Sequence, residues 1–224
     1  MEIASGKWRA LISQGAAAFG LTVSDPQAIQ FSRHARLLAD WNRKINLTAI
    51  TDPVQVAIKH FLDAIAPLNH IPCNGRLLDI GTGGGFPGIP LKIMRPDQPM
   101  TLIDSVRKKI TFVKSVIREL GLEEIEALHA RAEQLGCDAA YAAKFDVIVC
   151  RALADPRAVV RLALPLLTAK GCIVIYQGPG AGPQDSADLF QQNRTQRFEL
   201  STVTYQLPIL GDDRAVCILK AVNT

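Results

Sequence analysis

The chain has 224 residues, of which 48% are hydrophobic and 21% are charged, which is typical of a globular domain with a well-filled core and excludes a disordered or fibrous chain. No apolar run approaches the roughly 18 residues of a membrane-spanning helix, and the N-terminus MEIASGKWRALISQGAAAFG lacks the pattern of a secretory signal, so we expect a cytoplasmic protein. The net charge of +4 suits a basic enzyme or an RNA-binding one, so the distribution of charge along the chain decides more than its sum.

The first predicted elements are helical. Asp25-Pro26 resembles an N-cap followed by a proline in the first turn, and Phe31, Ala35, Leu38 and Trp41 then recur at helical spacing. Asp52-Pro53 signals a second helix, which carries Val56, Ile58, Phe61 and Ile65. We expect residues 1–70 to form a helical extension and residues 71–224 a second unit, the two making one compact body.

Beyond residue 75, short β-rich runs alternate with helical stretches. The runs RLLDIG, MTLIDS, IEALHAR, FDVIVCRA and GCIVIYQG predict parallel strands buried on both faces. STVTYQLP and AVCILKAV, separated only by ILGDDR, predict an antiparallel hairpin at the edge. The predicted fold class is α/β, a doubly wound, mostly parallel sheet of seven strands. GPGAGPQDS, residues 178–186, is predicted to be a flexible loop.

Four glycines fall within five residues after the first predicted strand, in RLLDIGTGGGFPGIPLKI. Ligands of a doubly wound sheet bind beyond the carboxyl ends of its strands, so these glycines occupy a functional place in the topology. Gly83-x-Gly85-x-x-Gly88 fits a dinucleotide fingerprint. Asp79-x-Gly81-x-Gly83-x-Gly85 fits the pattern of S-adenosylmethionine sites.

The chemistry of the two ligands distinguishes between these two glycine patterns. A pyrophosphate is anionic, and the Asp79 carboxylate at the strand end would lie unfavourably close to it. S-adenosylmethionine carries a sulfonium and an ammonium group, which a carboxylate can orient, while Gly81, Gly83 and Gly85 let the main chain pass the ligand without clashes. We therefore favour the methyl donor; a dinucleotide, or a tight turn with no ligand, stays open.

Asp104 ends the second predicted strand. An acidic side chain there can accept both ribose hydroxyls of either cofactor, so it indicates a nucleoside without choosing between them. The alternative is that Asp104 or Ser105 caps the helix that starts at Val106.

The helix SVRKKITFVKSVIREL has five basic residues and no acidic one between Ser105 and Arg118. We place Val106, Ile110, Val113, Ile117 and Leu120 on one apolar stripe. The basic residues lie on an adjacent face or near it: Arg107, Lys108, Lys109, Lys114 and Arg118. A solvated face usually mixes signs, so this pattern beside a cofactor pocket indicates a polyanion such as nucleic acid, with an ordinary solvated face as the alternative.

The fourth strand ends FDVIVCRALAD, without the D/N-P-P-Y/F motif of amino-methyltransferases. Cys150 lacks the context of a cytosine-C5 nucleophile, so we expect a buried thiol. Arg151 stands at the strand mouth, where its guanidinium can donate to phosphate, to the O6/N7 edge of a guanine, or to the donor's carboxylate. With no candidate base nearby, guanine N7 fits best as nucleophile because it needs no deprotonation. Arg151 is therefore the candidate catalytic residue.

The five cysteines are scattered and form no CxxC pair or metal-ligand spacing with histidine: Cys73, Cys137, Cys150, Cys172 and Cys217. We expect buried, reduced thiols and no metal site.

Several motifs occur in order with fitting spacing: WNRKINLTAI, LLDIGTGGGFPGIPLKI, LIDS followed by basic residues, ARAEQL and CRALA. Together they resemble the bacterial RsmG family, also called glucose-inhibited division protein B, from about Asp40 to the C-terminal hairpin. The resemblance implies a Rossmann-like class I methyltransferase. It further implies methylation of N7 of a single guanine, guanine 527, in 16S ribosomal RNA, with S-adenosylmethionine as the donor.

The resemblance also implies roles for individual residues. Gly81, Phe86 and the Asp104 region would contact the donor, Ala132 and Glu133 would flank its adenine, and Arg151 would line the pocket. Arg131 and the pair Lys108–Lys109 would contact RNA or substrate. Relatives often have a lysine after the fifth strand where this chain has Gln177, which puts an RNA contact at that place in question.

The expected partner is 16S ribosomal RNA or the small ribosomal subunit, bound by a monomer with no membrane and no metal involved. Three alternatives remain. A small-molecule methyltransferase of the same fold would not need the basic helix. A dinucleotide-dependent oxidoreductase would need a proton relay, and no Tyr-x-x-x-Lys is obvious. A non-enzymatic RNA-binding protein would leave the donor pocket unexplained.

Overall fold

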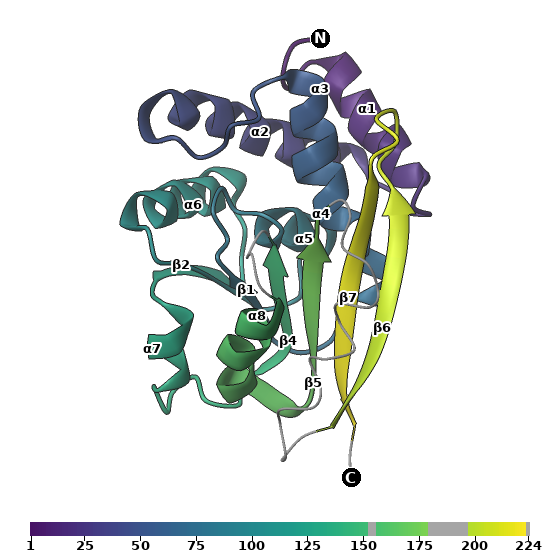
Figure 1. Ribbon diagram of the computed structural model, residues 1–224. Helices are drawn as coiled ribbons and strands as arrows, with labels where there is room; N and C mark the ends of the chain where they lie inside the picture. Colours follow the sequence, from purple (N-terminus) through teal and green to yellow (C-terminus); the bar gives the residue numbers. More distant parts are fainter. Residues whose placement is uncertain (152–155, 179–196, 223–224) are drawn as a thin grey trace.

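A seven-stranded sheet runs through the computed structural model, which describes residues 1–151, 156–178 and 197–222 (Figure 1). The strand order is β3-β2-β1-β4-β5-β7-β6. Strands β1 to β5 pair in parallel, and β7 pairs antiparallel with β5 and β6. The strands are β1 Leu77–Ile80, β2 Met100–Asp104, β3 Ile125–His129, β4 Phe145–Arg151, β5 Leu167–Gln177, β6 Arg197–Gln206 and β7 Asp213–Val222. The predicted fold class and edge hairpin are confirmed, and β5 begins upstream of the run expected for it.

Different helices cover the two faces of the sheet. Successive residues of a strand point to opposite faces, so neighbouring residues of one strand pack against different helices. On β1, Leu77 belongs to a buried cluster with the N-terminal helices and α6 (Arg107–Leu120). Its neighbour Leu78 belongs to a second cluster with α7 (Ala132–Gly136) and α8 (Pro156–Ala163). Both leucines are fully buried, which is why the parallel strands are apolar almost throughout.

The helices before β1 are α1 (Gly6–Ala17), α2 (Asp25–Ile45), α3 (Pro53–Val56), the π-helical segment η1 (Ala57–Leu62), α4 (Asp63–Ile65) and the short 3₁₀ helix η2 (Leu68–His70). Asp52 caps α3 as predicted, since its carboxylate accepts from the Gln55 N–H at 2.9 Å. The predicted cap of α2 was wrong by one residue. Ser24 is the N-cap: its hydroxyl and the Gln27 side chain accept from each other's backbone N–H, which forms a capping box.

The helical extension lies at the carboxyl ends of the parallel strands, and in Figure 1 the arrows of β4 and β5 point toward it. Trp8 of α1 and Phe31 of α2 meet Phe61 of η1 edge to face, with ring centroids 5.4 and 5.7 Å apart. All three side chains are fully buried in the cluster that continues onto one sheet face. This packing fixes the extension over the strand ends. The division of the chain at residue 70 stays a prediction.

Helix α6 buries a wider face than the predicted stripe. Ile110, Val113 and Leu120 are buried as expected, but so are Phe112 and Val116. Val106, assigned to the stripe, is 43% exposed, because it is the N-cap residue and lies outside the helical periodicity. Phe112 faces Trp41 of α2, with ring centroids 5.7 Å apart. The buried face is therefore wider than the sequence pattern suggested, since α6 packs against both the sheet and α2.

The cysteine prediction holds for three of the five residues. Cys150, Cys172 and Cys217 are buried thiols, and burial raises the pKa of Cys172 to about 11. Cys73 and Cys137 are exposed free thiols, so their predicted burial was wrong. In the part of the chain that the structure describes, no helix is long and apolar enough to cross a membrane. Nor do these residues include a group of three or more His, Cys, Asp or Glu that could hold a metal ion.

Two segments of the sequence analysis fall largely outside the described residues. They are the ALAD stretch that follows Arg151 and the predicted loop at residues 178–186, of which Gly178 alone is described. The remaining described helices are α5 (Gly88–Met94), which begins in the glycine-rich stretch, and the short 3₁₀ helix η3 (Leu164–Leu166) before β5.

Candidate functional site

A cavity of about 470 Å³ lies at the carboxyl ends of β1, β2 and β4. The sheet side contributes Ile80–Gly84, Phe86, Ile103–Val106, Lys109 and Ala130–Glu133. The extension side contributes Leu38, Leu47, Thr48 and His60, and Arg151 and Leu162 complete the lining. The strand order reverses beside β1, so the cavity occupies the place where a doubly wound sheet binds its ligands.

The glycine loop presents bare main chain to this cavity. Gly81 and Gly83 have φ of +75° and +57°, and a Cβ built on either would meet at most one atom, 3.9 Å away. A positive φ favours glycine, and the open space in front of it leaves room for a ligand against the backbone. Gly85 serves packing instead: a Cβ there would lie 2.7 Å from Ile89 Cγ1, and Gly85 does not line the cavity as the described residues define it.

Asp79 lies beneath the loop rather than in the cavity wall. Its side chain is fully buried, and its Oδ2 accepts from the Thr82 hydroxyl at 2.7 Å and from the Gly88 N–H at 2.9 Å. These bonds tie the strand end to the loop and to the start of α5. Its Oδ1 is buried and has no donor among the described residues. Burial raises the pKa of Asp79 to about 6, in spite of the two hydrogen bonds.

Asp104 borders the cavity and braces it from the neighbouring strand. Its Oδ2 accepts from the Gly83 N–H at 3.0 Å, and its Oδ1 accepts from the Val106 N–H at 2.8 Å. The N-cap residue of α6 is Val106 and no side chain caps this helix, so the capping role considered for Asp104 was wrong. Its bond to the Val106 N–H instead closes a turn just before α6. Each carboxylate oxygen keeps a second lone pair, so a contact with ribose hydroxyls stays a prediction.

The predicted adenine-flanking residues also reach the cavity. Ala132 and Glu133 begin α7 just after β3, and Arg131 precedes them as the N-cap residue. Ala132 is buried, whereas Arg131 and Glu133 are exposed at the rim.

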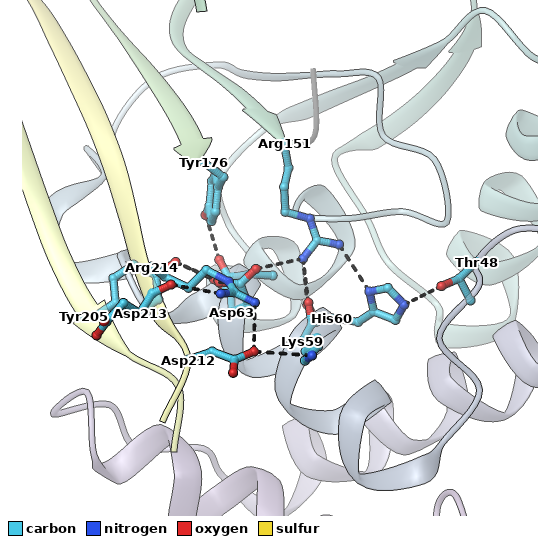
Figure 2. A network of polar contacts seen from close by, with 11 residues as sticks. Thr48, Lys59, His60, Asp63, Arg151, Tyr176, Tyr205, Asp212, Asp213 and Arg214 are labelled. Atoms are coloured by element: carbon cyan, nitrogen blue, oxygen red, sulfur yellow. Dashed lines mark hydrogen bonds and ion pairs between the residues drawn. The ribbon is translucent and has the colours of Figure 1, made fainter. Parts of the chain in front are cut away.

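Arg151 points from the end of β4 into the helical extension, as Figure 2 shows. Its Nη1 donates to the Lys59 carbonyl at 3.0 Å and lies 3.4 Å from Asp63 Oδ2, while its Nη2 lies 3.5 Å from His60 Nδ1. Its Cζ lies 5.2 Å from the centre of the Phe86 ring. The guanidinium therefore ties β4 to η1 and α4. Its Nε–H and one Nη2 hydrogen have no acceptor among the described residues.

Asp63 is shared between this network and the C-terminal hairpin. Its Oδ1 accepts from the Tyr205 hydroxyl at 2.9 Å and lies 3.9 Å from Arg214 Nε. Burial raises the pKa of Asp63, against the opposing effects of Arg151, Tyr205 and Arg214. Tyr176 of β5 adds a bond from its hydroxyl to the Ala64 carbonyl at 2.7 Å. Three strands are thus fastened to one short helical stretch.

Phe86 is stacked between two imidazoles. The ring centroids of His34 and His60 each lie 4.8 Å from that of Phe86, with interplanar angles of 15° and 17°. Burial lowers the pKa of His34 to about 4; burial, with the charge of Arg151, lowers the pKa of His60 to about 3. Both rings are therefore neutral at pH 7, which suits close stacking beside an arginine.

The predicted basic residues divide into two groups. Lys109 and Arg131 line the cavity. Arg107 and Lys108 are exposed at the start of α6, and Lys114 and Arg118 are exposed farther along it, beside a groove that also contains Glu123 and Glu126. Gln177 is buried at the end of β5.

Comparison with known proteins shows the family of this chain. A sequence model of the family described as rRNA small subunit methyltransferase G matches residues 27–214. A ribosomal RNA small subunit methyltransferase G from Geobacter is 41% identical over 209 residues, covering 93% of this chain and 95% of that protein. One from Desulforamulus reducens is 37% identical over 214 residues, covering 95% and 89%. The chain belongs to the RsmG family.

Solved structures of lower identity agree on the fold. A SAM-dependent methyltransferase from Aquifex aeolicus has a TM-score of 0.58 at 16% identity and covers 79% of this chain and 97% of that one. The tRNA methyltransferase TrmK from B. subtilis has a TM-score of 0.57 at 13% identity, covering 74% and 67%. The chain therefore has the Rossmann-like fold of class I methyltransferases.

The residues that line the cavity of this RsmG family member from the extension side were missed by the sequence analysis. Leu38 and His60 belong to helices whose hydrophobic periodicity predicted only packing. Leu47 and Thr48 lie in the stretch that joins those helices. One signal was present in the sequence. Lys59, His60 and Asp63 interrupt the otherwise apolar run from Val56 to Ile65, which is unusual unless these polar side chains have partners.

Asp79 offers a test of the buried carboxylate beneath the loop. Its pKa in the folded chain, about 6, exceeds the ordinary value of 3.8, so the folded state binds the proton more tightly than the unfolded state. Asp79 therefore contributes stability below about pH 4 that is lost as the pH rises through 6. We expect the unfolding free energy of wild type, relative to Asp79→Asn, to fall by roughly 1–3 kcal/mol between pH 4 and pH 7 in urea titrations. A difference that is constant with pH would contradict this assignment.

Proposed function

We propose that this protein methylates N7 of a single guanine in 16S ribosomal RNA, guanine 527 by its resemblance to the RsmG family, with S-adenosylmethionine as the methyl donor. The observation that carries the proposal is the two-walled cavity at the strand ends. One wall is bare glycine backbone backed by Asp104, and the other is built from the extension around Arg151.

The sheet wall fits the donor. Gly81 and Gly83 would accept it against the main chain, Phe86 would contact it, and Asp104 has lone pairs left for its ribose. Ala132 and Glu133 would flank its adenine. Asp79 and Gly85, which we predicted as binding residues, would act by holding the loop in shape. When bound, S-adenosylmethionine supplies an electrophilic methyl group.

Among the residues that the structure describes, the lining offers no well-placed base, which supports an N7 nucleophile. Among the described residues of the cavity, His60, Asp104 and Glu133 could accept a proton. His60 has a partner at each ring nitrogen and a pKa lowered to about 3, and Asp104 already accepts two backbone N–H groups. Glu133 lies exposed at the rim. Guanine N7 carries a lone pair and no hydrogen, so forming its bond to a methyl carbon releases no proton.

Arg151 would then act through position rather than proton transfer. Its contacts with Lys59, His60 and Asp63 hold the extension wall at a fixed place beside the strand ends. Holding a nucleophile in line is worth several kcal/mol of the barrier when the geometry is tight. Any direct contact would come from its Nε–H and its remaining Nη2 hydrogen. Arg151 thus remains the residue we assign to the chemical step.

The RNA would approach over the surface that carries Arg131 and the basic residues of α6. Lys109 and Arg131 at the cavity, with the exposed Arg107 and Lys108, would contact phosphates around the target base. Lys114 and Arg118 would extend that footprint along α6. A small-molecule methyltransferase of the same fold would have no use for this charge, so the RNA substrate is favoured.

The direct test is methyl incorporation from S-adenosylmethionine into small-subunit ribosomal RNA or particles, with the product nucleoside identified by mass. We expect 7-methylguanosine. Gly83→Ala should weaken donor binding tenfold or more in calorimetry, because the new methyl group occupies space at the cavity wall. Gly121→Ala is the matched control: its φ is +60° and its Cβ also meets open space, but it lies at the C-cap of α6. Another product, or equal loss of binding in both variants, would contradict the proposal.

A second prediction locates the RNA footprint. Removing one phosphate-binding side chain lowers the slope of log affinity against log salt by about one unit or less. Arg131→Ala and Lys114→Ala should do so in RNA-binding titrations. Lys7→Ala, an exposed lysine on α1, should not, because α1 and α6 lie on opposite sides of the molecule (Figure 1). An equal change in all three variants would mean that the basic residues of α6 and the cavity rim form no specific footprint.

A further inference from the structure

The hydrogen bonds around His60 fix which of its ring nitrogens carries the proton. Its Nδ1 lies 3.5 Å from Arg151 Nη2, and a guanidinium can only donate, so Nδ1 must accept. The ring is neutral, so its single proton is on Nε2. Nε2 lies 2.8 Å from the Thr48 hydroxyl oxygen and therefore donates to it. Figure 2 shows this chain from Arg151 through His60 to Thr48.

The Thr48 oxygen receives a second donor. The Ile50 N–H donates to the same Oγ1 at 3.0 Å. A hydroxyl has two lone pairs and one proton, so both acceptor sites of Thr48 are filled and its own proton must be offered elsewhere. Its Oγ1 has no acceptor partner among the described residues. Thr48 is thus a donor whose direction is set by two fixed N–H groups.

Thr48 lines the part of the cavity where an acceptor substrate would lie. It lines the cavity from the extension side, and it also borders a second cavity of about 360 Å³ that is lined by residues of the extension. Asn42 holds it there: Nδ2 donates to the Thr48 carbonyl at 2.9 Å, and Oδ1 accepts from the Leu47 and Thr48 N–H groups. If the donor occupies the sheet wall, this wall is left for the target base.

We propose that the Thr48 hydroxyl donates a hydrogen bond to O6 of the guanine that is methylated and so positions its N7. This inference rests on the proposed function. O6 and N7 lie side by side on one edge of guanine and are both acceptors, so a donor at O6 orients the base while leaving the N7 lone pair unused. Adenine presents an amino group at that position, and two donors would face each other. Thr48 is therefore a specificity-determining residue, and His60 and Arg151 set its direction.

The test compares two variants on three RNAs. Thr48→Val keeps the shape of the side chain without the hydroxyl, and Thr48→Ser keeps the hydroxyl. The substrate is 16S ribosomal RNA rebuilt by ligation with guanosine, inosine or 2-aminopurine riboside at the methylated position. Inosine keeps O6 and N7, whereas 2-aminopurine keeps N7 and lacks O6. Donor affinity is measured for each variant by calorimetry.

On the guanosine RNA we expect Thr48→Val to lower kcat/KM by about tenfold to a hundredfold, and Thr48→Ser by less than about threefold. Wild type should accept inosine and lose a similar factor on 2-aminopurine. Thr48→Val should lose almost nothing more on 2-aminopurine, because the partner of the missing hydroxyl is already absent.

Three results would overturn the inference while leaving the proposed function intact. Thr48→Val could keep full activity on guanosine. It could lose the same factor on guanosine and 2-aminopurine RNA, which would mean a purely structural role. It could weaken donor binding instead, which would mean that the hydroxyl faces the donor. Failure of wild type to form any 7-methylguanosine would overturn the proposed function, and this inference with it.

Discussion

The contact between Arg151 and the helical extension decides how the two walls of the cavity stand relative to each other. The arginine ends a central strand, and its guanidinium reaches the Lys59 carbonyl, the His60 ring and the Asp63 carboxylate. The side chains of Arg151 and Asp63 are 15% and 11% exposed, so both are mostly withdrawn from water. A buried pair of this kind adds little net stability, but removing one partner costs about 3–5 kcal/mol because the other charge is left uncompensated. The contact therefore specifies an arrangement more than it strengthens the fold.

The rest of the site follows from that arrangement. Because His60 must accept from Arg151, it donates to Thr48, and its ring stacks on Phe86 of the glycine loop. The π-helical segment η1 places the Lys59 and His60 carbonyls within reach of the same guanidinium nitrogen, at 3.0 and 3.5 Å. Such segments often occur at functional sites, where they re-space the residues of a helix. The polar residues of η1 and α4 thus fix the extension side of the cavity through Arg151. The aromatic cluster of Trp8, Phe31 and Phe61 holds the extension in place.

Sequence reasoning predicted the sheet wall better than the extension wall, for a physical reason. Strand ends and glycine loops carry local signals, because parallel strands are continuously apolar and a backbone with positive φ favours glycine. Gly81, Gly83, Asp104 and Ala132 were placed at the cavity on those signals and on the family resemblance. His60 meets Arg151 only through tertiary packing, across 91 positions of the chain, and Thr48 is linked to Arg151 only through His60. No local sequence pattern reports such contacts. Asp79 was expected beside the ligand but lies buried beneath the loop, because its position depends on how α5 packs.

The central claim is that Arg151 governs the chemical step by holding the acceptor wall, and Arg151→Lys tests it most directly. Lysine keeps the positive charge beside Asp63 but lacks the planar fork that reaches three acceptors at once. Single-turnover methylation at saturating RNA and donor should slow by tenfold or more. The melting temperature, the donor affinity and the RNA concentration for half-saturation should stay close to wild type. An unchanged rate at saturation, with only the RNA requirement shifted, would make Arg151 a docking residue and contradict the account.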